Sequence, residues 1–494
     1  MTPTDDAYAD GEHLAPGVAE THSAWVVFLG DRAYKVKKPV ALEFLDFSTR
    51  EARERVLHRE LELNRRLAPD VYLGVADVVG PDGEVCEHLL VMRRLPTDRR
   101  LSALVAAGSP LDDEIRQIAR AIAAFHASAD TSPEIARAGS PEVVRSKVER
   151  DLDELRAFTG DLLDAAELDA VANLVRRYLA GRTPLLEERV ATGHIRDGHG
   201  DLLADDIFCL PDGPQIIDCI EFYDQLRSGD VLADVAFLAM DLERLGAAEH
   251  AERLLAWYRE FSNEHHPESL AHYYVAFRAL IRSKVSCVRA TQGDAAATAP
   301  ARDLLALAHR HLRQARVRLV LVGGPPGTGK STLAAELSAR LGWAVLRSDE
   351  VRKDITGVGR AASAAAPLGE GIYDAATTER TYEQLLARAR RALEHGEPVV
   401  LDASWSRDTW RAAARRLADE TSSDLVELCC DAPADVTRRR VEERAARGAD
   451  LSDATVPVAE AMRASFEAWP TAAVIPTAGT VAESVERALD VIDR

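Results

Sequence analysis

The spacing of hydrophobic residues predicts a small sheet-containing lobe at the start of the chain. Short apolar runs at residues 24–29 and 33–37 flank a Gly30–Asp31 turn, and another run follows at 88–92, as in β-strands. Residues 49–67 have the spacing of a helix. We expect this small lobe to extend over about residues 20–96.

The region from Leu111 to Leu179 is rich in alanine and predicts helices. One apolar stripe recurs there at helical spacing; its members are Ile115, Ile118, Ala119, Ile122 and Phe125. Residues 294–316 are also alanine-rich and repeat with a helical period from Leu304 to Leu312. We therefore expect a connector that packs as a helix instead of a flexible linker.

The last third of the chain begins with a pattern typical of phosphate binding. An apolar run at 319–322 precedes GPPGTGKS, and leucines then recur at helical spacing. A P-loop needs this order of strand, glycine-rich turn and helix, because the glycines let backbone N–H groups curve around a phosphate. The alternative is a chance glycine-rich turn. The residues predicted to bind ATP here are Gly324, Pro325, Pro326, Gly327, Thr328, Gly329, Lys330, Ser331 and Thr332.

Two of these side chains have specific roles in a P-loop. Lys330 would place its charge at the β- and γ-phosphates, and Ser331 would offer its hydroxyl to Mg²⁺. Further strands are predicted at 344–346, 398–402 and 426–430. Asp349 would then lie at the carboxyl end of one of these strands, where ligands bind in open α/β sheets. Asp402 ends another strand, and its alternative is a structural aspartate without a ligand.

A helix after the fourth strand carries a row of arginines. Arg440, Arg444 and Arg447 recur at i, i+4 and i+7, so they share one face. Such a face stabilises the charge of a migrating phosphoryl group, which predicts a helical lid that contacts ATP. The alternative is a surface helix whose arginines pair with Glu442 and Glu443.

A second candidate site lies in the middle of the chain. The stretch HGDLLADDIF begins at His199, and two short apolar segments then lead to Asp218. Asp201, Asp206 and Asp218 would be three carboxylates on a strand–loop–strand. Two carboxylates can hold Mg²⁺ while a third accepts a hydroxyl proton. The alternative is a solvated acidic hairpin.

Composition narrows the class of protein. Hydrophobic and charged contents of 47% and 29% are typical of soluble globular domains. No apolar run reaches the roughly 20 residues of a membrane span, and the start of the chain lacks the features of a signal peptide. Six cysteines without C-x-x-C spacing indicate reduced thiols, so we expect a cytoplasmic protein. The net charge of −20 disfavours a broad nucleic-acid surface.

Lysine is scarce, which draws attention to where it is used. Seven of the 61 basic residues are lysines, and three of them, Lys35, Lys37 and Lys38, fall within four positions. Lysine and arginine are not interchangeable where a compact charge meets a phosphate. The cluster is a candidate second phosphate site, or an exposed edge strand protected by lysines.

Three motifs follow one another here: HGD, the later IID that ends at Asp218, and SGDVLAD at 228–234. Together they resemble the aminoglycoside-phosphotransferase branch of the protein-kinase fold, over about residues 20–295. The resemblance implies that Asp201 is the catalytic base, that Asp218 binds Mg²⁺, and that Lys35 and Glu60 form the ATP-binding pair of the small lobe. The family has Asn where this chain has Asp206, which can still ligate Mg²⁺ but adds negative charge. We find no clear glycine-rich loop between the first two predicted strands.

One helix of the kinase-like region is predicted to carry positive charge on one face. Tyr274, Arg278 and Arg282 recur at i, i+4 and i+8 and therefore share a helix face. They are candidates to contact an anionic ligand in the cleft of that lobe, and the alternative is a structural ion-pair ladder.

Residues 317–494 resemble small P-loop kinases of the gluconate-kinase, zeta-toxin and polynucleotide-kinase type, through the P-loop, the S-D-x-x-R stretch and the arginine-rich helix. The resemblance implies that Asp349 acts on the acceptor hydroxyl, that Arg352 contacts substrate or phosphate, and that Asp402 is the Walker-B-like acid. The whole chain resembles bacterial fusions of the two kinds of domain.

The sequence thus predicts α/β plus α+β architecture. We expect an N-terminal bilobal protein-kinase-like domain at 1–295, a helical connector at 296–316, and at 317–494 a P-loop kinase domain with a parallel sheet and a helical lid. The expected function is Mg²⁺- and ATP-dependent phosphate transfer to a hydroxyl of a small molecule, mainly in the C-terminal domain. The alternatives are an ATP-switched, ligand-sensing regulatory protein with a pseudokinase N-terminal half, and a polynucleotide kinase. The sequence identifies neither the acceptor nor the oligomeric state.

Overall fold

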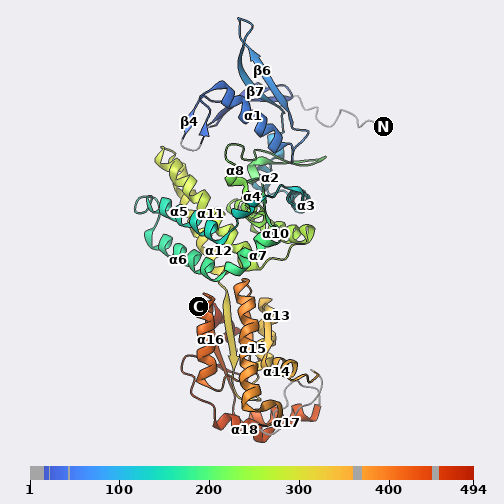
Figure 1. Ribbon diagram of the computed structural model, residues 1–494, viewed down its shortest axis with the longest axis vertical. Coiled ribbons are helices and arrows are strands. Elements are labelled where there is room, and N and C mark those ends of the chain that lie inside the picture. The colour runs from blue at the N-terminus through green and yellow to red at the C-terminus, as the bar shows by residue number, and fades with distance from the viewer. Residues whose placement is uncertain (1–15, 22, 43–44, 360–369, 448–454, 494) are drawn as a thin grey trace, which may run out of the picture. The chain divides into compact units, whose positions relative to one another are not determined.

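The structure, a computed structural model, describes residues 16–21, 23–42, 45–359, 370–447 and 455–493. The chain divides into two compact units (Figure 1). The first comprises Met1–Asp169, Leu186–His266 and Tyr274–His311, and the second comprises Ala170–Leu185, Pro267–Tyr273 and Leu312–Arg494. The sequence boundaries at 295 and 316 stay a prediction.

The first unit begins with an antiparallel five-stranded sheet in the order β1-β2-β3-β7-β6. Its strands are β1 (Gly17–Glu20), β2 (Ala24–Leu29), β3 (Arg32–Lys37), β6 (Tyr72–Val79) and β7 (Val85–Arg93), and a short pair, β4 (Ala41–Leu42) and β5 (Leu45–Asp46), lies beside it. β3 lies inside the sheet, so the alternative of a lysine-protected edge strand is wrong. The sequence analysis predicts neither β1 nor β6. In the case of β1 the strand is short, polar and exposed.

Helix α1 (Arg50–Asn64) packs against this sheet. Its predicted start is confirmed, because the hydroxyl of Thr49 caps the helix by accepting the N–H of Ala52 at 3.2 Å. Leu57 of α1 lies in a core with Ala33, Tyr72 and Leu90 of three strands. Burial of this face fixes α1 under the strand that carries Lys35 and Lys37.

The predicted helical region forms α2 (Leu101–Ala106), α3 (Asp112–Ser128), α4 (Pro133–Arg137), α5 (Pro141–Arg156), α6 (Ala165–Gly181) and α7 (Thr183–Ala191). After the HGD region come α8 (Asp224–Arg227), α9 (Val231–Arg244), α10 (Ala248–Ser262), α11 (Glu268–Thr291) and α12 (Thr298–Gln314). The predicted stripe on α3 is buried, and the predicted connector is helical, with Leu304 and Leu312 buried.

Two short antiparallel pairs bring the motifs of this region together. β8 (Ile195–Asp197) pairs with β11 (Ser228–Asp230), and β9 (Ile207–Leu210) pairs with β10 (Gly213–Ile216). The first pair places the HGD turn beside the SGDVLAD motif. The second is the predicted strand–loop–strand between Asp206 and Asp218.

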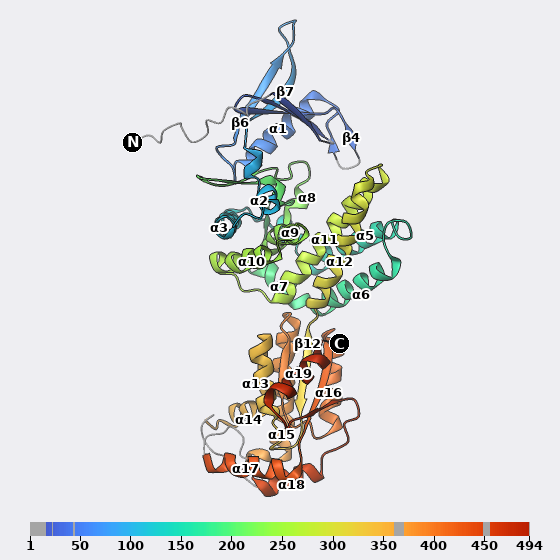
Figure 2. The ribbon, with the colours of Figure 1, turned by 180° about the vertical axis from the view of Figure 1, so that it is seen from behind.

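The second unit contains a parallel five-stranded sheet in the order β13-β14-β12-β15-β16. Its strands are β12 (Arg318–Gly323), β13 (Ala344–Arg347), β14 (Val399–Asp402), β15 (Asp424–Asp431) and β16 (Ala473–Pro476), and its helices are α13 (Lys330–Leu341), α14 (Ser348–Thr356), α15 (Ala375–Glu394), α16 (Asp408–Glu420), α17 (Ala434–Arg447), α18 (Val456–Ala464) and α19 (Val481–Ile492). Helices cover both faces of the sheet, with α13 and α19 sharing one core (Figure 2). β12 is the central strand, with β13 and β14 on one side and β15 and β16 on the other, so the P-loop lies where the strand order reverses.

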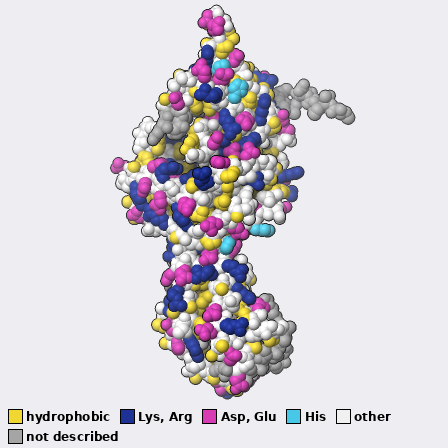
Figure 3. Space-filling model, in the orientation of Figure 1, with side chains coloured by type: hydrophobic (Ala, Val, Ile, Leu, Met, Phe, Trp, Pro, Cys, Tyr) yellow, Lys and Arg dark blue, Asp and Glu magenta, His cyan; other side chains and the backbone are white. Residues whose placement is uncertain are grey.

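Lys and Arg side chains are interspersed with Asp and Glu on the face seen in Figure 3. Among the helices of the described segments, none combines the length and the apolar character that a bilayer span demands.

Candidate active sites

The HGD turn is held by the aspartate that ends the SGDVLAD motif. The Asp234 carboxylate accepts the backbone N–H of His199 at 2.7 Å and of Gly200 at 2.9 Å, and it contacts His126 Nε2 at 3.1 Å. Burial would raise the pKa of Asp234, but these contacts hold it below its ordinary value. Gly200 has a φ of +91°, and a Cβ there would lie 3.2 Å from the carbonyl oxygen of Leu226. The turn that carries Asp201 therefore requires glycine.

Asp206 and Asp218 flank one antiparallel pair, β9 with β10. The N–H of Ile217 donates to the carbonyl of Asp206 at 2.9 Å, and His199 Nε2 donates to the carbonyl of Ile217 at 3.0 Å. Burial, followed by the charges of Asp218 and Asp201, raises the pKa of Asp206 well above its ordinary value. Asp218 itself adopts a left-handed backbone with φ 63°, a strained conformation that clusters at functional sites.

Lys35 connects the two lobes of this site. Its ammonium donates to Glu60 of α1 at 2.7 Å and to Asp218 at 2.9 Å. Burial opposes the charge, yet Asp218 and Glu60 raise the pKa of Lys35 well above its ordinary value. The charge of Lys35 in turn lowers the pKa of Asp218 to about 2. The structure therefore brings together Lys35, Glu60 and Asp218.

Lys37 is a member of this network that motif comparison misses. It is buried, and it contacts Glu60 at 2.7 Å and Glu221 at 2.5 Å. Glu60 is thus shared by two lysines. The scarcity of lysine elsewhere in the chain is the signal that singles out Lys37.

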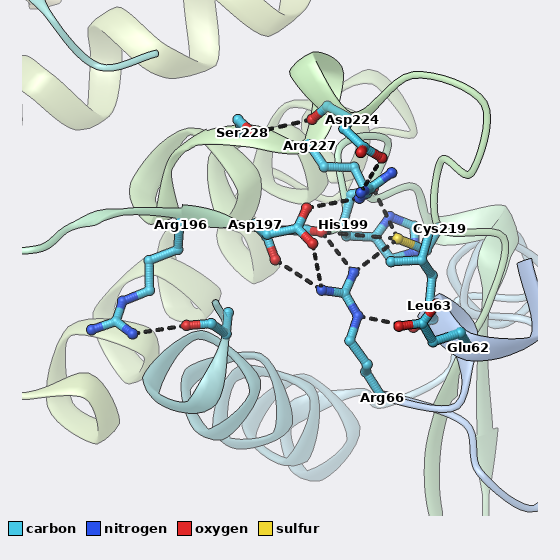
Figure 4. A network of polar contacts seen from close by, with 12 residues as sticks. Glu62, Leu63, Arg66, Arg196, Asp197, His199, Cys219, Asp224, Arg227 and Ser228 are labelled. Carbon is cyan, nitrogen blue, oxygen red and sulfur yellow. Dashed lines mark hydrogen bonds and ion pairs between the residues drawn. The ribbon is translucent and has the colours of Figure 1, made fainter. Parts of the chain in front are cut away.

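Two arginines, Arg66 and Arg227, contact Asp197 and the backbone around it (Figure 4). Arg66, just after α1, donates to the carbonyls of Asp197 and Gly198 at 3.0 Å each and contacts the sulfur of Cys219 at 3.3 Å. Arg227 reaches the same Asp197 from the other side, at 2.8 Å, and also donates to the carbonyl of Ile220 at 2.7 Å. The segments before HGD and after Asp218 are therefore held together and tied to α1.

The Asp201 carboxylate is partly exposed, and burial raises its pKa above the ordinary value, against the charge of Arg282. The predicted face of Tyr274, Arg278 and Arg282 divides in the structure. Tyr274 is buried and donates to Asp230 at 3.1 Å, whereas Arg282 Nη1 lies 3.9 Å from Asp201. Only the later part of this face thus adjoins the HGD turn.

The P-loop has the conformation that its glycines predict. Gly324, Gly327 and Gly329 have φ of +132°, +83° and +87°. A Cβ at Gly324 would lie 2.6 Å from the carbonyl oxygen of Cys430, and one at Gly327 would lie 2.7 Å from that of Thr437. The loop therefore packs against its own sheet and α17, with Lys330 at the start of α13.

The predicted acids of this half meet at the carboxyl end of the sheet. Asp402 lies in register with Val322 of the P-loop strand and contacts Arg347 Nε at 3.2 Å. Burial raises the pKa of Asp349, the charge of Lys330 opposes this rise, and Asp402 adds to it. The charges of Lys330 and Asp402 therefore both act on Asp349 at this end of the sheet.

Arg352 is near the same acids but engages protein groups. Its guanidinium donates to the carbonyl of Ile372 at 3.0 Å and to the hydroxyl of Thr378 at 3.1 Å, and it lies 4.9 Å from the ring centroid of Tyr373. These contacts fix the helix that follows β13. The predicted contact of Arg352 with substrate or phosphate stays a prediction.

Arg440 of the predicted lid lies on the P-loop itself. Its Nη2 donates to the carbonyl of Thr477 at 2.7 Å, and its Nη1 is 3.5 Å from the carbonyl of Gly327. Arg444 lies one turn further along α17. The side chain of Arg447 lies outside the described residues. The structure thus places at least one arginine of this face beside the phosphate-binding turn.

Oxygen donors suited to Mg²⁺ are present in both sites. Among the residues that the structure describes, no three His, Cys, Asp or Glu side chains converge to hold a metal alone. Mg²⁺ bound with nucleotides needs only one or two carboxylates beside the phosphates. The charge of Asp218 raises the pKa of Asp206, and both carboxylates lie at the ends of the β9–β10 pair. Asp402 and the hydroxyl of Ser331 offer the same chemistry in the other half.

Both sites have the parts of a nucleotide-dependent kinase, and comparisons with known proteins agree. A family model described as "Phosphotransferase enzyme family" matches residues 26–273, and one described as "AAA domain" matches residues 319–469. Uncharacterized proteins of Mycobacterium tuberculosis and Mycobacterium bovis are 41% identical over 491 residues, which cover 99% of this chain and 98% of theirs. The chain belongs to the phosphotransferase enzyme family, and it is an ATP-dependent kinase.

Two solved structures are similar to parts of the chain. The GDP complex of aminoglycoside 2'-phosphotransferase-IIIa is 16% identical, with a TM-score of 0.39, and covers 62% of this chain and 95% of its own. A gluconokinase from Sinorhizobium meliloti 1021 is 17% identical, with a TM-score of 0.25, and covers 36% of this chain and 91% of its own.

Proposed function

We propose that the chain transfers the γ-phosphate of ATP to a hydroxyl of a small molecule such as a sugar, a sugar acid or an aminoglycoside-like compound, and that the P-loop half performs the main reaction. The observation that carries the proposal is the meeting of Lys330, Asp349 and Asp402 at the carboxyl end of the parallel sheet. A phosphate in the P-loop and a hydroxyl beside Asp349 would be neighbours there.

The proposed step needs little covalent chemistry from the protein. The acceptor oxygen attacks the γ-phosphorus, its proton passes to the Asp349 carboxylate, and the bond to the β-phosphate oxygen breaks so that ADP leaves. Burial raises the pKa of Asp349, which makes it a stronger base than an exposed aspartate. Lys330 and Arg440 would stabilise the charge that develops on the phosphoryl oxygens. Mg²⁺ held by Ser331 and Asp402 would neutralise charge on the β- and γ-phosphates.

We also propose a second transfer site in the N-terminal half. The ion pair of Lys35 with Glu60, with Asp218 beside it, supports this proposal, because a kinase site requires its lysine to be paired with a helix glutamate. Asp201 would accept the hydroxyl proton there, and Asp206 and Asp218 would hold Mg²⁺.

A transfer screen with radiolabelled γ-phosphate tests both proposals. It compares wild type, Lys330→Ala and Asp201→Asn over sugars, sugar acids, aminoglycosides and nucleotides. Transfer that Lys330→Ala abolishes belongs to the P-loop half, and transfer that Asp201→Asn abolishes belongs to the N-terminal half. Water hydrolysis without transfer to any acceptor would favour the ATP-switched regulatory protein. Salt-sensitive DNA or RNA binding with phosphorylated ends would favour the polynucleotide kinase.

A further inference from the structure

Helix α11 places an incompletely paired arginine beside the proposed base of the N-terminal site. Arg282 Nη1 lies 3.9 Å from Asp201 Oδ1, which is too far for a hydrogen bond. The side chains of Arg282 and Asp201 are 28% and 37% exposed. Within the described part of the chain, Arg282 has no other hydrogen-bond or ion-pair partner. It can therefore contact a ligand that also reaches Asp201.

Arg278, one turn earlier on α11, adds a second charge. It donates to the carbonyl of Ala233 at 2.9 Å and is 3.4 Å from the carbonyl of Gly200, and its guanidinium lies 4.7 Å from the ring centroid of Phe237. Among the described residues, no carboxylate lies within ion-pair distance of Arg278. Its positive charge is thus held behind the HGD turn by carbonyl oxygens, and Asp234 and Asp201 act on it only at longer range.

Lys147 on α5 supplies a third charge. In the described segments it makes neither a hydrogen bond nor an ion pair. The contact of Lys284 with Asp151 at 2.6 Å joins α11 to α5, the helix that carries Lys147. Burial, together with the charges of Arg278 and Arg150, lowers the pKa of Lys147. The neighbouring acid Asp151 is already engaged by Lys284 at 2.6 Å.

Two of the acids near these cations are hydrogen-bonded to other groups. Asp234 is satisfied by two backbone N–H groups and by His126, and Asp151 is satisfied by Lys284. Asp201 is the remaining acid that faces the cluster. Partly buried charges without a partner are costly, so sites that keep them commonly bind an opposite charge.

We propose that the acceptor of the N-terminal site is an anionic hydroxyl compound, whose carboxylate or phosphate group is bound by Lys147, Arg278 and Arg282. The inference rests on the proposed transfer activity of this half and narrows its acceptor. The acceptor hydroxyl gives its proton to Asp201 as its oxygen bonds to the γ-phosphorus, and ADP departs with the electrons of the broken bond. A polycationic aminoglycoside would be repelled.

Matched acceptors test this inference in the full-length Lys330→Ala protein, which reports on the N-terminal half alone. The pairs are D-gluconate with D-glucitol, D-glycerate with glycerol, and glucosamine 6-phosphate with glucosamine, and kanamycin is the polycation. We expect transfer to at least one acidic member, with a kcat/KM at least about tenfold above that of its partner. Asp201→Asn should abolish this transfer.

Single variants then identify the groups that bind the anion. Lys147→Gln and Arg282→Gln should each raise KM for the acidic acceptor about 10- to 100-fold, the value of a charge-assisted hydrogen bond, while KM for ATP changes little. Arg156→Gln, on the same helix as Lys147 but exposed and paired with Asp153, should leave both constants unchanged. Rising ionic strength should also raise KM for the acidic acceptor in the parent protein, which needs no variant.

The possible failures are distinguishable. Preference for a neutral acceptor or for kanamycin, with transfer still dependent on Asp201, would overturn the inference and leave the proposed function intact. An equal loss with acidic and neutral acceptors would mean that the cations serve the γ-phosphate, and would also overturn it. Transfer to no acceptor would remove the proposed activity of this half, and the inference with it.

Discussion

Replacing Glu60 by glutamine tests the ion-pair network at the centre of the N-terminal site. The Glu60 side chain is fully buried and receives Lys35 on one oxygen and Lys37 on the other, each at 2.7 Å. Glutamine keeps the shape of the side chain and removes its charge. Two lysines, of which Lys37 is buried and Lys35 nearly so, would then lose a shared counter-ion.

The magnitude follows from these contacts. Removing one partner of a buried ion pair costs about 3–5 kcal/mol, because the remaining charge stays desolvated. Lys35 keeps Asp218 at 2.9 Å and Lys37 keeps Glu221 at 2.5 Å, so we expect a single such loss instead of two. A unit of roughly 290 residues unfolds with an entropy of about 0.6 kcal/mol/K, so the midpoint should fall by about 5–8 °C.

Scanning calorimetry measures this shift, and the same helix offers a matched control. Glu62 is 69% exposed and pairs with Arg59 at 2.8 Å, a surface contact worth about 0–1 kcal/mol. Glu62→Gln should therefore lower the midpoint by less than about 2 °C. Equal midpoints for Glu60→Gln and Glu62→Gln would refute the reasoning, since the buried network would then contribute no more than a surface pair.

Four further outcomes follow from the two sites. Lys330→Ala should abolish most ATP turnover in a steady-state assay, and wild-type turnover in the folded variant would remove the P-loop from the mechanism. Asp349→Asn should leave ATP affinity by titration nearly unchanged while single-turnover transfer falls by about 10²–10⁴-fold; equal loss of both would assign Asp349 to Mg²⁺. The rate of Asp201-dependent transfer should rise with pH through a pKa above the ordinary 3.8, because burial raises the pKa of Asp201 and only its ionised form accepts a proton. Arg282→Gln should move this rise in rate to higher pH, because it removes a positive charge that lowers the pKa of Asp201. An unchanged pH profile would contradict the contact between the two residues. Asp206→Asn should strengthen ATP binding without Mg²⁺ in the Lys330→Ala background, as it removes a negative charge near the phosphates; unchanged affinity would place ATP elsewhere.

Local patterns predict the P-loop half well for a physical reason. Parallel strands are buried on both faces, so they occur as continuous apolar runs, and the runs at 319–322 and 398–402 correspond to β12 and β14. The loop between strand and helix follows from its glycines. β16 (Ala473–Pro476) escapes prediction because it is a short strand at the edge of the sheet, where Val474 is exposed.

The sequence predicts which residues belong to the candidate sites but not the hydrogen bonds and ion pairs that connect them. Motif spacing indicates Asp201, Asp206 and Asp218, yet nothing local indicates that Asp234 would hold the HGD turn through two backbone N–H groups. That role depends on the pairing of β8 with β11, which joins segments about thirty residues apart. The signal is present in the chain as the SGDVLAD motif, but its partner becomes visible only in the fold.

The contacts of Lys37 cannot be predicted from the sequence pattern of its strand. The alternation of a strand places Lys35 and Lys37 on one face, and both reach Glu60. Only Lys35 also reaches Asp218, whereas Lys37 meets Glu221, 184 residues away in sequence. Which carboxylate each lysine meets depends on where the segment after β10 returns beneath the sheet. Asn64 accepts the N–H of Cys219 at 2.9 Å, and Arg66 contacts the sulfur of the same residue, so the end of α1 sets that position. The packing of α1 therefore determines which carboxylate each lysine contacts, and the sequence of the strand alone does not predict it.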